Sequence, residues 1–489
     1  AGYRACRRCR PDTVPGSPEW DVRADALARA MRLIGDGVVE REGVPGVAAR
    51  LGYSTRQLQR ITAAELGASP LAIARSQRAH TARVLIETSG MALGDIAFAA
   101  GFGSIRSFND AIRRAFGLTP SQVRERAASR PHRRDASSPG SSAAPLPESC
   151  LQFHDVSPGN NAGKRLATGG NIAEGPSVAA RSQAQHRAAR PTTTPSALGR
   201  LDVRLAFRPP LAAAPLFGHL VATAVPGVEE WRDGAYRRTL VLPHGPGIVA
   251  LSPRDDHVAA TLWLADPRDL TPAIGRCRRL LDLDADPTAV DEPLAADPAL
   301  APLVATGPGA RIPRTVDAAE FAVRVVLGQQ VSTAAAATQT GRLAAAHGVP
   351  VDDPAGGLTR LFPTPDALAA LAPEDIPGPR KRAVTLITLA NALATSHLDL
   401  GPGADRAEAR RALAALPGIG PWTVELVVMR GLGDPDAFPA TDLGLVRALQ
   451  GLGNPDPERW RPWRSYAAQY LWATLDHPIN RLPTERTHP

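Results

Sequence analysis

Hydrophobic and polar residues follow different periods in different parts of the chain. Residues 20–128 carry apolar side chains at helical spacing, and residues 309–485 do so almost throughout. Between them, three stretches alternate apolar and polar residues as strands do: 201–207, 238–243 and 247–251. With a helical stretch at 270–281, they predict a small α+β domain over 201–308. The sequence therefore predicts a multidomain fold: an all-α module, a small α+β domain and an all-α domain.

The segment between the first two domains has a different composition. Residues 129–200 are rich in Ser, Ala, Arg, Pro and Gly with little periodicity, which is typical of a flexible linker. No apolar run approaches the roughly 20 residues that span a membrane, and no export signal is recognisable. The four cysteines are too scattered for a disulfide framework. We expect a cytoplasmic protein without a membrane partner.

The first domain contains an internal repeat, since residues 47–70 are echoed by residues 96–120. Each copy predicts a short helix, a Gly-aromatic turn and a second helix, with Ser54 and Ser104 as N-caps of the second helices. This is helix-turn-helix geometry used twice, and the second helices suit successive major grooves of DNA. The candidate groove-facing residues are Arg56, Gln57, Arg60, Arg106, Ser107 and Asn109. The candidate core residues of these helices are Leu58, Ile61, Phe108 and Ile112.

Charge supports a nucleic-acid partner for this domain. Residues 1–135 hold 22 Arg and 13 Asp or Glu, a net charge of +9, whereas the remainder has a net charge of −1. A basic excess of this kind favours binding to phosphates.

A glycine-rich break separates two predicted helices near the end of the chain. A helix over 406–415 is interrupted by Leu-Pro-Gly-Ile-Gly, and Pro421 suits the first turn of a helix that continues to about Arg430. The bare backbone at Gly418, Ile419 and Gly420 could offer N–H groups to a phosphate, or form a plain tight turn. Asp442 begins a further helix over 443–449, where an Asp can serve as an N-cap or as a functional carboxylate.

The motif LPGIGPWT (416–423) with an Asp twenty residues later resembles the helix-hairpin-helix DNA glycosylases. The segments 323–332, 381–390 and 460–472 narrow the resemblance to the 3-methyladenine DNA glycosylase II group, over 201–485. The resemblance implies that Asp442 is catalytic and that Gly418 and Gly420 contact phosphate.

The same resemblance assigns roles to aromatic and amide side chains. It implies that Trp422 and Trp472 line the pocket for the damaged base, and that Gln330 fills the gap left by a flipped base. Core packing is the alternative for the tryptophans, and capping of a turn is the alternative for Gln330. Trp460 and Trp463 are assigned to packing. Leu426 departs from the family, which can carry an aromatic residue there.

Two absences from the sequence narrow the chemistry. Glycosylases that also cut the strand use a lysine in the second helix of the hairpin, where this chain has Trp422. Iron–sulfur relatives need four cysteines after the hairpin, but none follows Cys277. We therefore expect a monofunctional hydrolase without a cofactor. Asp442 would stabilise the sugar cation while an alkylated, already cationic purine departs.

The first domain also resembles a known family. The double helix-turn-helix resembles AraC-type activators, and Cys6-x-x-Cys9 in residues 1–15 resembles the end of the zinc domain of Ada-type adaptive-response regulators. Cys6 and Cys9 would be half of a zinc site, complete only if further ligands precede them, or an incidental pair.

Together these features predict a fusion: a DNA-binding regulator module joined to an alkylpurine DNA glycosylase of the bacterial nucleoid. We expect a monomer whose partners are double-stranded DNA and, through the AraC-type module, RNA polymerase. The rival hypothesis is a transcription regulator whose glycosylase half only senses damaged DNA.

Overall fold

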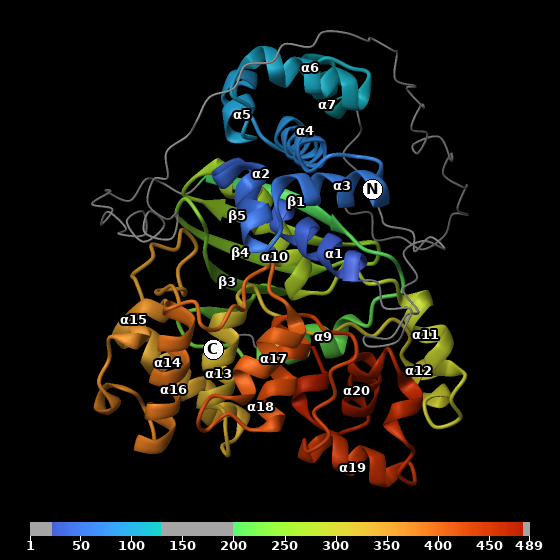
Figure 1. Cartoon of the computed structure of the whole chain (residues 1–489), viewed down its shortest axis with the longest axis vertical. Coiled ribbons are helices and arrows are strands. Elements are labelled where there is room, and N and C mark those ends of the chain that lie inside the picture. Colours follow the sequence, from blue (N-terminus) through green and yellow to red (C-terminus); the bar gives the residue numbers. More distant parts are fainter. Residues whose placement is uncertain (1–21, 129–198, 483–489) are drawn as a thin grey trace, which may run out of the picture. The chain divides into compact units, whose positions relative to one another are not determined.

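The computed structural model describes residues 22–128 and 199–482, which are drawn as ribbons in Figure 1. Cys6, Cys9 and nearly all of the predicted linker lie outside the described residues.

The first described part is wholly helical. Its helices are α1 (Val22–Gly35), α2 (Val38–Arg50), α3 (Thr55–Leu66), α4 (Pro70–Thr88), α5 (Leu93–Ala99), α6 (Ile105–Phe116) and α7 (Pro120–Ala128). The predicted second helices are α3 and α6. Both N-caps are confirmed, because Ser54 accepts from the Gln57 amide and Ser104 from the Ser107 amide. Leu58, Phe108 and Ile112 are buried as predicted, whereas Ile61 is only half-buried.

The second part begins with a five-stranded antiparallel sheet. Its strands are β1 (Gly199–Ala206), β2 (Glu229–Arg232), β3 (Ala235–Val241), β4 (Pro246–Pro253) and β5 (His257–Leu264), in the order β1-β5-β4-β3-β2. Helices α9 (Ala213–Ala222) and α10 (Leu270–Leu280) and a short 3-10 turn, η1 (Pro267–Asp269), belong to this domain. The sequence predicted β1, β3 and β4 with shifted bounds and missed β2 and β5.

The third part is an all-α domain. Its helices are α11 (Pro287–Ala295), α12 (Ala301–Thr306), α13 (Ala318–Leu327), α14 (Thr333–His347), α15 (Pro365–Ala369), α16 (Arg380–Ala394), α17 (Arg406–Ala414), α18 (Pro421–Leu426), α19 (Leu443–Gly451) and α20 (Arg464–Ala473). The 3-10 turns are η2 (Pro373–Asp375), η4 (Pro457–Trp460) and η5 (Pro478–Asn480).

The helix predicted from Pro421 to Arg430 is not a single α-helix. It runs as α18 to Leu426 and then widens into a π-helical turn, η3 (Val427–Gly431). Such a π-turn rotates the side chains that follow it, and it is frequent at functional sites. Here it carries Arg430 into the interior, where only 7% of that residue is exposed.

A buried network of charges joins the sheet to the helical domain. Arg238 of β3 donates to Glu229 of β2 and to Glu320 of α13, each over 2.8 Å, and Arg324 of α13 donates to Glu229 over 2.8 Å. Removing one member of such a network would leave an uncompensated buried charge. The network therefore fixes α13 against the sheet, and with it the segment Gly328–Gln330 that follows α13.

Candidate active site

The carboxylate of Asp442 accepts hydrogen bonds from four N–H groups. As the N-cap of α19, its Oδ1 accepts from the amides of Gly444 (3.0 Å) and Leu445 (3.1 Å). The indole Nε1 of Trp472 donates to the same oxygen over 2.9 Å, and that of Trp422 donates to Oδ2 over 3.0 Å. The N-cap interpretation of Asp442 is thus confirmed. It does not compete with the functional one, because four donors hold the carboxylate as a fixed anion.

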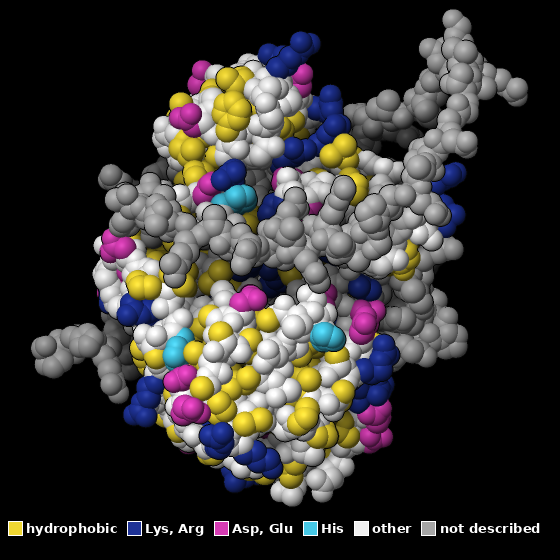
Figure 2. Space-filling view, turned by 60° about the vertical axis from the view of Figure 1, so that its left-hand side comes forward, with side chains coloured by type: hydrophobic (Ala, Val, Ile, Leu, Met, Phe, Trp, Pro, Cys, Tyr) yellow, Lys and Arg dark blue, Asp and Glu magenta, His cyan; other side chains and the backbone are white. Residues whose placement is uncertain are grey.

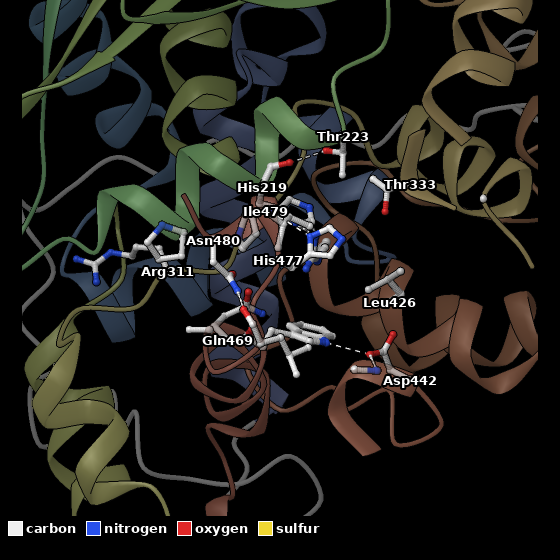
Figure 3. A pocket seen from close by; sticks show the side chains of 18 of the residues that line it. His219, Thr223, Arg311, Thr333, Leu426, Asp442, Gln469, His477, Ile479 and Asn480 are labelled. Atoms are coloured by element: carbon white, nitrogen blue, oxygen red, sulfur yellow. Dashed lines mark hydrogen bonds between the residues drawn. The ribbon is translucent and has the colours of Figure 1, made fainter. Parts of the chain in front are cut away.

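This anion lies in the wall of a cavity of about 750 Å³. The cavity lies between the sheet domain and the helical domain, and its lining comes from α9, α13, α14, α18, η3 and α20. Figure 3 shows Asp442 and His219 on different sides of the lining, with Leu426 near Asp442. A nucleobase rotated out of a duplex needs such a concave, largely apolar site.

The four tryptophans near the end of the chain divide into two groups. Trp422 and Trp472 are half-buried and line the cavity, whereas Trp460 is buried in the core of the helical domain. Trp463 packs edge-on against Tyr466 at 5.9 Å between ring centres, away from the cavity lining. The arrangement agrees with a pocket role for the first pair and a packing role for the second.

The two glycines of the hairpin meet different constraints. Gly418 has a φ of +84°, and a Cβ there would lie 2.1 Å from Thr385 Oγ1, so only glycine fits. A Cβ on Gly420 would meet nothing within 4 Å, so this position faces open space. Within the described part of the chain, neither amide has a hydrogen-bond acceptor.

Ile419, between these glycines, has a different environment from its neighbours. Its amide donates to Leu416 O over 3.2 Å, and its side chain is buried. The phosphate role of all three hairpin residues stays a prediction, and the amides of Gly418 and Gly420 are the ones without an acceptor in the described residues.

The segment after α13 brings a second loop to the hairpin. Gln329 Nε2 donates to Gly418 O and to Thr423 Oγ1, each over 3.1 Å, which ties the loop to the hairpin. The next residue, Gln330, has a φ of +58° and an exposed side chain. A left-handed backbone is costly for glutamine, and backbone strain of this kind is frequent at functional sites. The sequence did not reveal the tethering role of Gln329.

The helix-turn-helix candidates differ in how free their side chains are. Gln57 accepts from the Ser54 amide over 2.9 Å, and Ser107 donates to Ser104 O over 2.8 Å, so both serve the caps. Asn109 is half-buried, whereas Arg56, Arg60 and Arg106 are exposed. In the face shown by Figure 2, basic side chains lie in small groups rather than in one patch.

Two residues of the cavity were missed by the sequence reasoning. His219 comes from α9 of the sheet domain, and Arg430 comes from the π-turn η3. The only signal was a single polar residue beside apolar neighbours, in PLFGHLVA and in LVVMRG. Such a residue is equally compatible with a solvated helix face.

The described ranges contain no cluster of three His, Cys, Asp or Glu side chains that could hold a metal ion. Cys277 is fully buried, and burial raises the pKa of its thiol to about 12. Nor does any helix in these ranges have the length and apolarity to cross a membrane.

Comparison with known proteins assigns each part of the chain. Family models match at residues 47–126 (helix-turn-helix domain), 202–317 (AlkA N-terminal domain) and 323–467 (HhH-GPD superfamily base excision DNA repair protein). The chain is 51% identical to the probable bifunctional transcriptional activator/DNA repair enzyme AlkA of Mycobacterium tuberculosis, over 99% of this chain and 87% of that protein. The chain belongs to the family of bifunctional AlkA proteins.

Further relatives resemble the AlkA half alone. DNA-3-methyladenine glycosylase 2 of Escherichia coli is 36% identical over 55% of this chain and 96% of its own length. The solved structure of a 3-methyladenine DNA-glycosylase from Archaeoglobus fulgidus is 20% identical with a TM-score of 0.47, and the match covers 56% of this chain and 97% of that one. The family confirms the predicted fusion and the multidomain fold, and double-stranded DNA is the partner that both halves of an AlkA protein share.

Proposed function

We propose that this protein removes alkylated purines, of the 3-methyladenine and 7-methylguanine type, from double-stranded DNA by hydrolysing the N-glycosidic bond. The observation that carries the proposal is the Asp442 carboxylate, held by four N–H donors in the wall of the cavity. The relationship to a protein named DNA-3-methyladenine glycosylase 2 supports the substrate class.

The proposed reaction moves charge from the base to the sugar. When the glycosidic bond breaks, its electron pair leaves with the base, and the sugar becomes an oxocarbenium-like cation. Asp442 stabilises that cation, and water then adds to the sugar carbon. A purine alkylated on a ring nitrogen is positive in DNA and neutral after departure, so it needs no strong general acid.

The product of this reaction is an intact strand with an abasic site. A strand-cutting glycosylase needs an amine at the sugar carbon. The only lysines of the chain are Lys164 and Lys381, and the position after Pro421 is Trp422, whose indole N–H is bonded to Asp442. We therefore propose a glycosylase without lyase activity.

Contacts outside the cavity would hold the flipped-out nucleotide. We assign phosphate contacts to the amides of Gly418 and Gly420. We assign to Gln330 the role of filling the gap that the flipped base leaves in the stack, because its exposed side chain lies on a loop tethered to the hairpin. The tether supports this pair of roles, because a phosphate bound at the hairpin would position the loop at the same nucleotide.

The helix-turn-helix half supports a second function, that of a transcription activator acting on promoter DNA. Arg56 of α3 and Arg106 of α6 are exposed at the starts of the two second helices, where base contacts are made in this motif, and Arg60 is exposed about one turn further along α3. A contact with RNA polymerase and a monomeric state stay predictions. The rival hypothesis, a sensor without catalysis, is distinguished by the experiment on Asp442.

That experiment replaces Asp442 with Asn. Asparagine also caps helices, so α19 should form, but the sugar cation loses its counter-charge. We expect base release from methylated duplex to fall by about 100-fold or more, with DNA binding retained. Asp317→Asn is the matched control, because Asp317 caps α13 through two amides at 2.8 and 3.0 Å and does not line the cavity. Release of 3-methyladenine by Asp442→Asn at the control's rate would refute the proposed catalytic role.

A further inference from the structure

Arg430 is a buried cation beside the cavity. It is 7% exposed and lines the same cavity as Asp442. Its guanidinium carbon lies 5.2 Å from the ring centre of Trp472, whose indole N–H edge is bonded to Asp442. Trp472 therefore has the cation over its face and the anion at its edge. Burial lowers the pKa of Arg430 to about 10, a change that Asp442 opposes, so the guanidinium stays charged at neutral pH.

This cation is unusually poorly compensated. In the described ranges its Nε has no hydrogen-bond partner, and Asp442 acts on it through the longer-range charge interaction rather than through a hydrogen bond. Its Nη1 contacts the imidazole of His219, at 3.2 Å from Nδ1 and closer to Nε2. Burial, with the nearby Arg430, holds the pKa of His219 well below its ordinary value, so the imidazole is neutral and can accept. A buried charge without a carboxylate in hydrogen-bond contact is costly, so the place of Arg430 in the cavity lining needs a functional explanation.

The movement of charge during the reaction supplies a functional explanation for the buried Arg430. On bond cleavage the departing base gains an electron pair. A cationic purine becomes neutral, and a neutral purine would become an anion. A fixed positive charge next to the base favours the product over the substrate in both cases. A group that is complementary to the charge of the transition state rather than to that of the substrate accelerates the chemical step.

We propose that Arg430, positioned by His219, is the residue that draws the glycosidic electron pair onto the departing base, opposite the carboxylate that receives the sugar cation. His219 and Asp442 lie on different sides of the cavity lining (Figure 3), so a base between them would have a positive group on one side and a negative group on the other. The proposal rests on the role of Asp442 given above. Its distinctive consequence is that Arg430 weakens the binding of a cationic base while speeding its release.

The test is Arg430→Met, which keeps much of the volume and removes the charge, with Arg430→Lys as the conservative variant. Single-turnover base release and duplex affinity would be measured with the full chain, on 7-methylguanine as a cationic purine and on hypoxanthine as a neutral one. We expect Arg430→Met to slow release from both duplexes by about 10- to 100-fold, with the duplex containing 7-methylguanine bound as tightly as before or more tightly. Arg430→Lys should recover part of the rate.

A merely structural role would give a different result. In that case Arg430→Met would lower both the affinity for the duplex and the rate of base release, and Arg430→Lys would restore neither. That pattern, or an unchanged rate of base release, would overturn the proposal. If Arg430→Met does not fold, His219→Leu is the second variant, because it removes the acceptor of the Arg430 hydrogen bond but leaves the charge. We expect it to slow base release while the affinity for the duplex is retained. An unchanged rate of base release would overturn the role of His219. Asp442→Asn separates the two proposals, since its failure to slow release would refute the glycosylase site itself.

Discussion

At Asp442 a single oxygen both caps a helix and serves the cavity, because Oδ1 accepts two backbone amides and the indole N–H of Trp472. The side chain therefore has little rotational freedom, and the direction of its charge is set before DNA arrives. Preorganisation of this kind lowers the cost of stabilising a developing cation.

The indole donors can be tested by Trp472→Phe and Trp422→Phe, which keep an aromatic ring but remove one N–H from Asp442. A hydrogen bond to a charged group contributes about 1.5–3 kcal/mol, so each change should slow base release by about 10-fold or more. Trp463→Phe is the control, since Trp463 does not line the cavity. Single-turnover rates on methylated duplex measure the effect, and equal rates for all three variants would contradict it.

At the scale of residues, the sequence predicted those candidate site residues that lie close to one another along the chain. Trp422 and the glycines belong to one local motif, and Asp442 lies twenty residues after Trp422. His219 and Arg430 are 211 residues apart, and their contact is created only when the sheet domain packs on the helical domain. Nothing in either local sequence specifies that contact.

At the scale of elements, the hairpin combines one position where a side chain cannot fit with one where it can. Gly418→Ala should lower the free energy of unfolding by about 1–3 kcal/mol, because φ is +84° and the Cβ would overlap Thr385. Gly420→Ala should leave thermal stability unchanged but weaken duplex binding, since a Cβ would meet an approaching phosphate. Thermal melting and duplex titration of both variants provide the measurement. Equal binding by Gly420→Ala and the wild type would remove the phosphate role of Gly420.

The strands show why element prediction stopped short. In β3 every residue from Ala235 to Leu240 is buried, so the alternation that signals a strand is weak and the predicted strand began three residues late. The four residues of β2 are too few for a pattern. The π-turn η3 is also invisible to periodicity, because it changes the helical phase by one residue within an apolar run. Long amphipathic helices and helix N-termini with a capping residue were predictable from the sequence. The short strands and the π-turn depend on tertiary contacts and were not.

At the scale of the whole molecule, charge is unevenly divided between the two halves, with +9 in residues 1–135 and −1 in the remainder. Replacing Arg56, Arg60 and Arg106 together by Gln should weaken binding to undamaged duplex and reduce the slope of log affinity against log salt by about 0.9 per lost phosphate contact. Base release on saturating DNA should not change. Arg75→Gln, an exposed arginine of α4, is the control. An unaltered slope in the triple variant would show that these arginines do not engage the DNA.

The cavity between the sheet domain and the helical domain also limits how such proteins can be recombined. Its lining comes from α9 of the sheet domain and from α18, η3 and α20 of the helical domain, while Arg238, Glu229, Glu320 and Arg324 hold the domains in register. A chimaera of two related proteins joined between β5 and α13 would combine a sheet domain from one protein with a helical domain from the other. Its domain interface would be mismatched, because His219 and Arg430 would come from different proteins. The sheet domain and the helical domain therefore have to be exchanged together, whereas relatives that match the AlkA half alone show that the helix-turn-helix module can be absent.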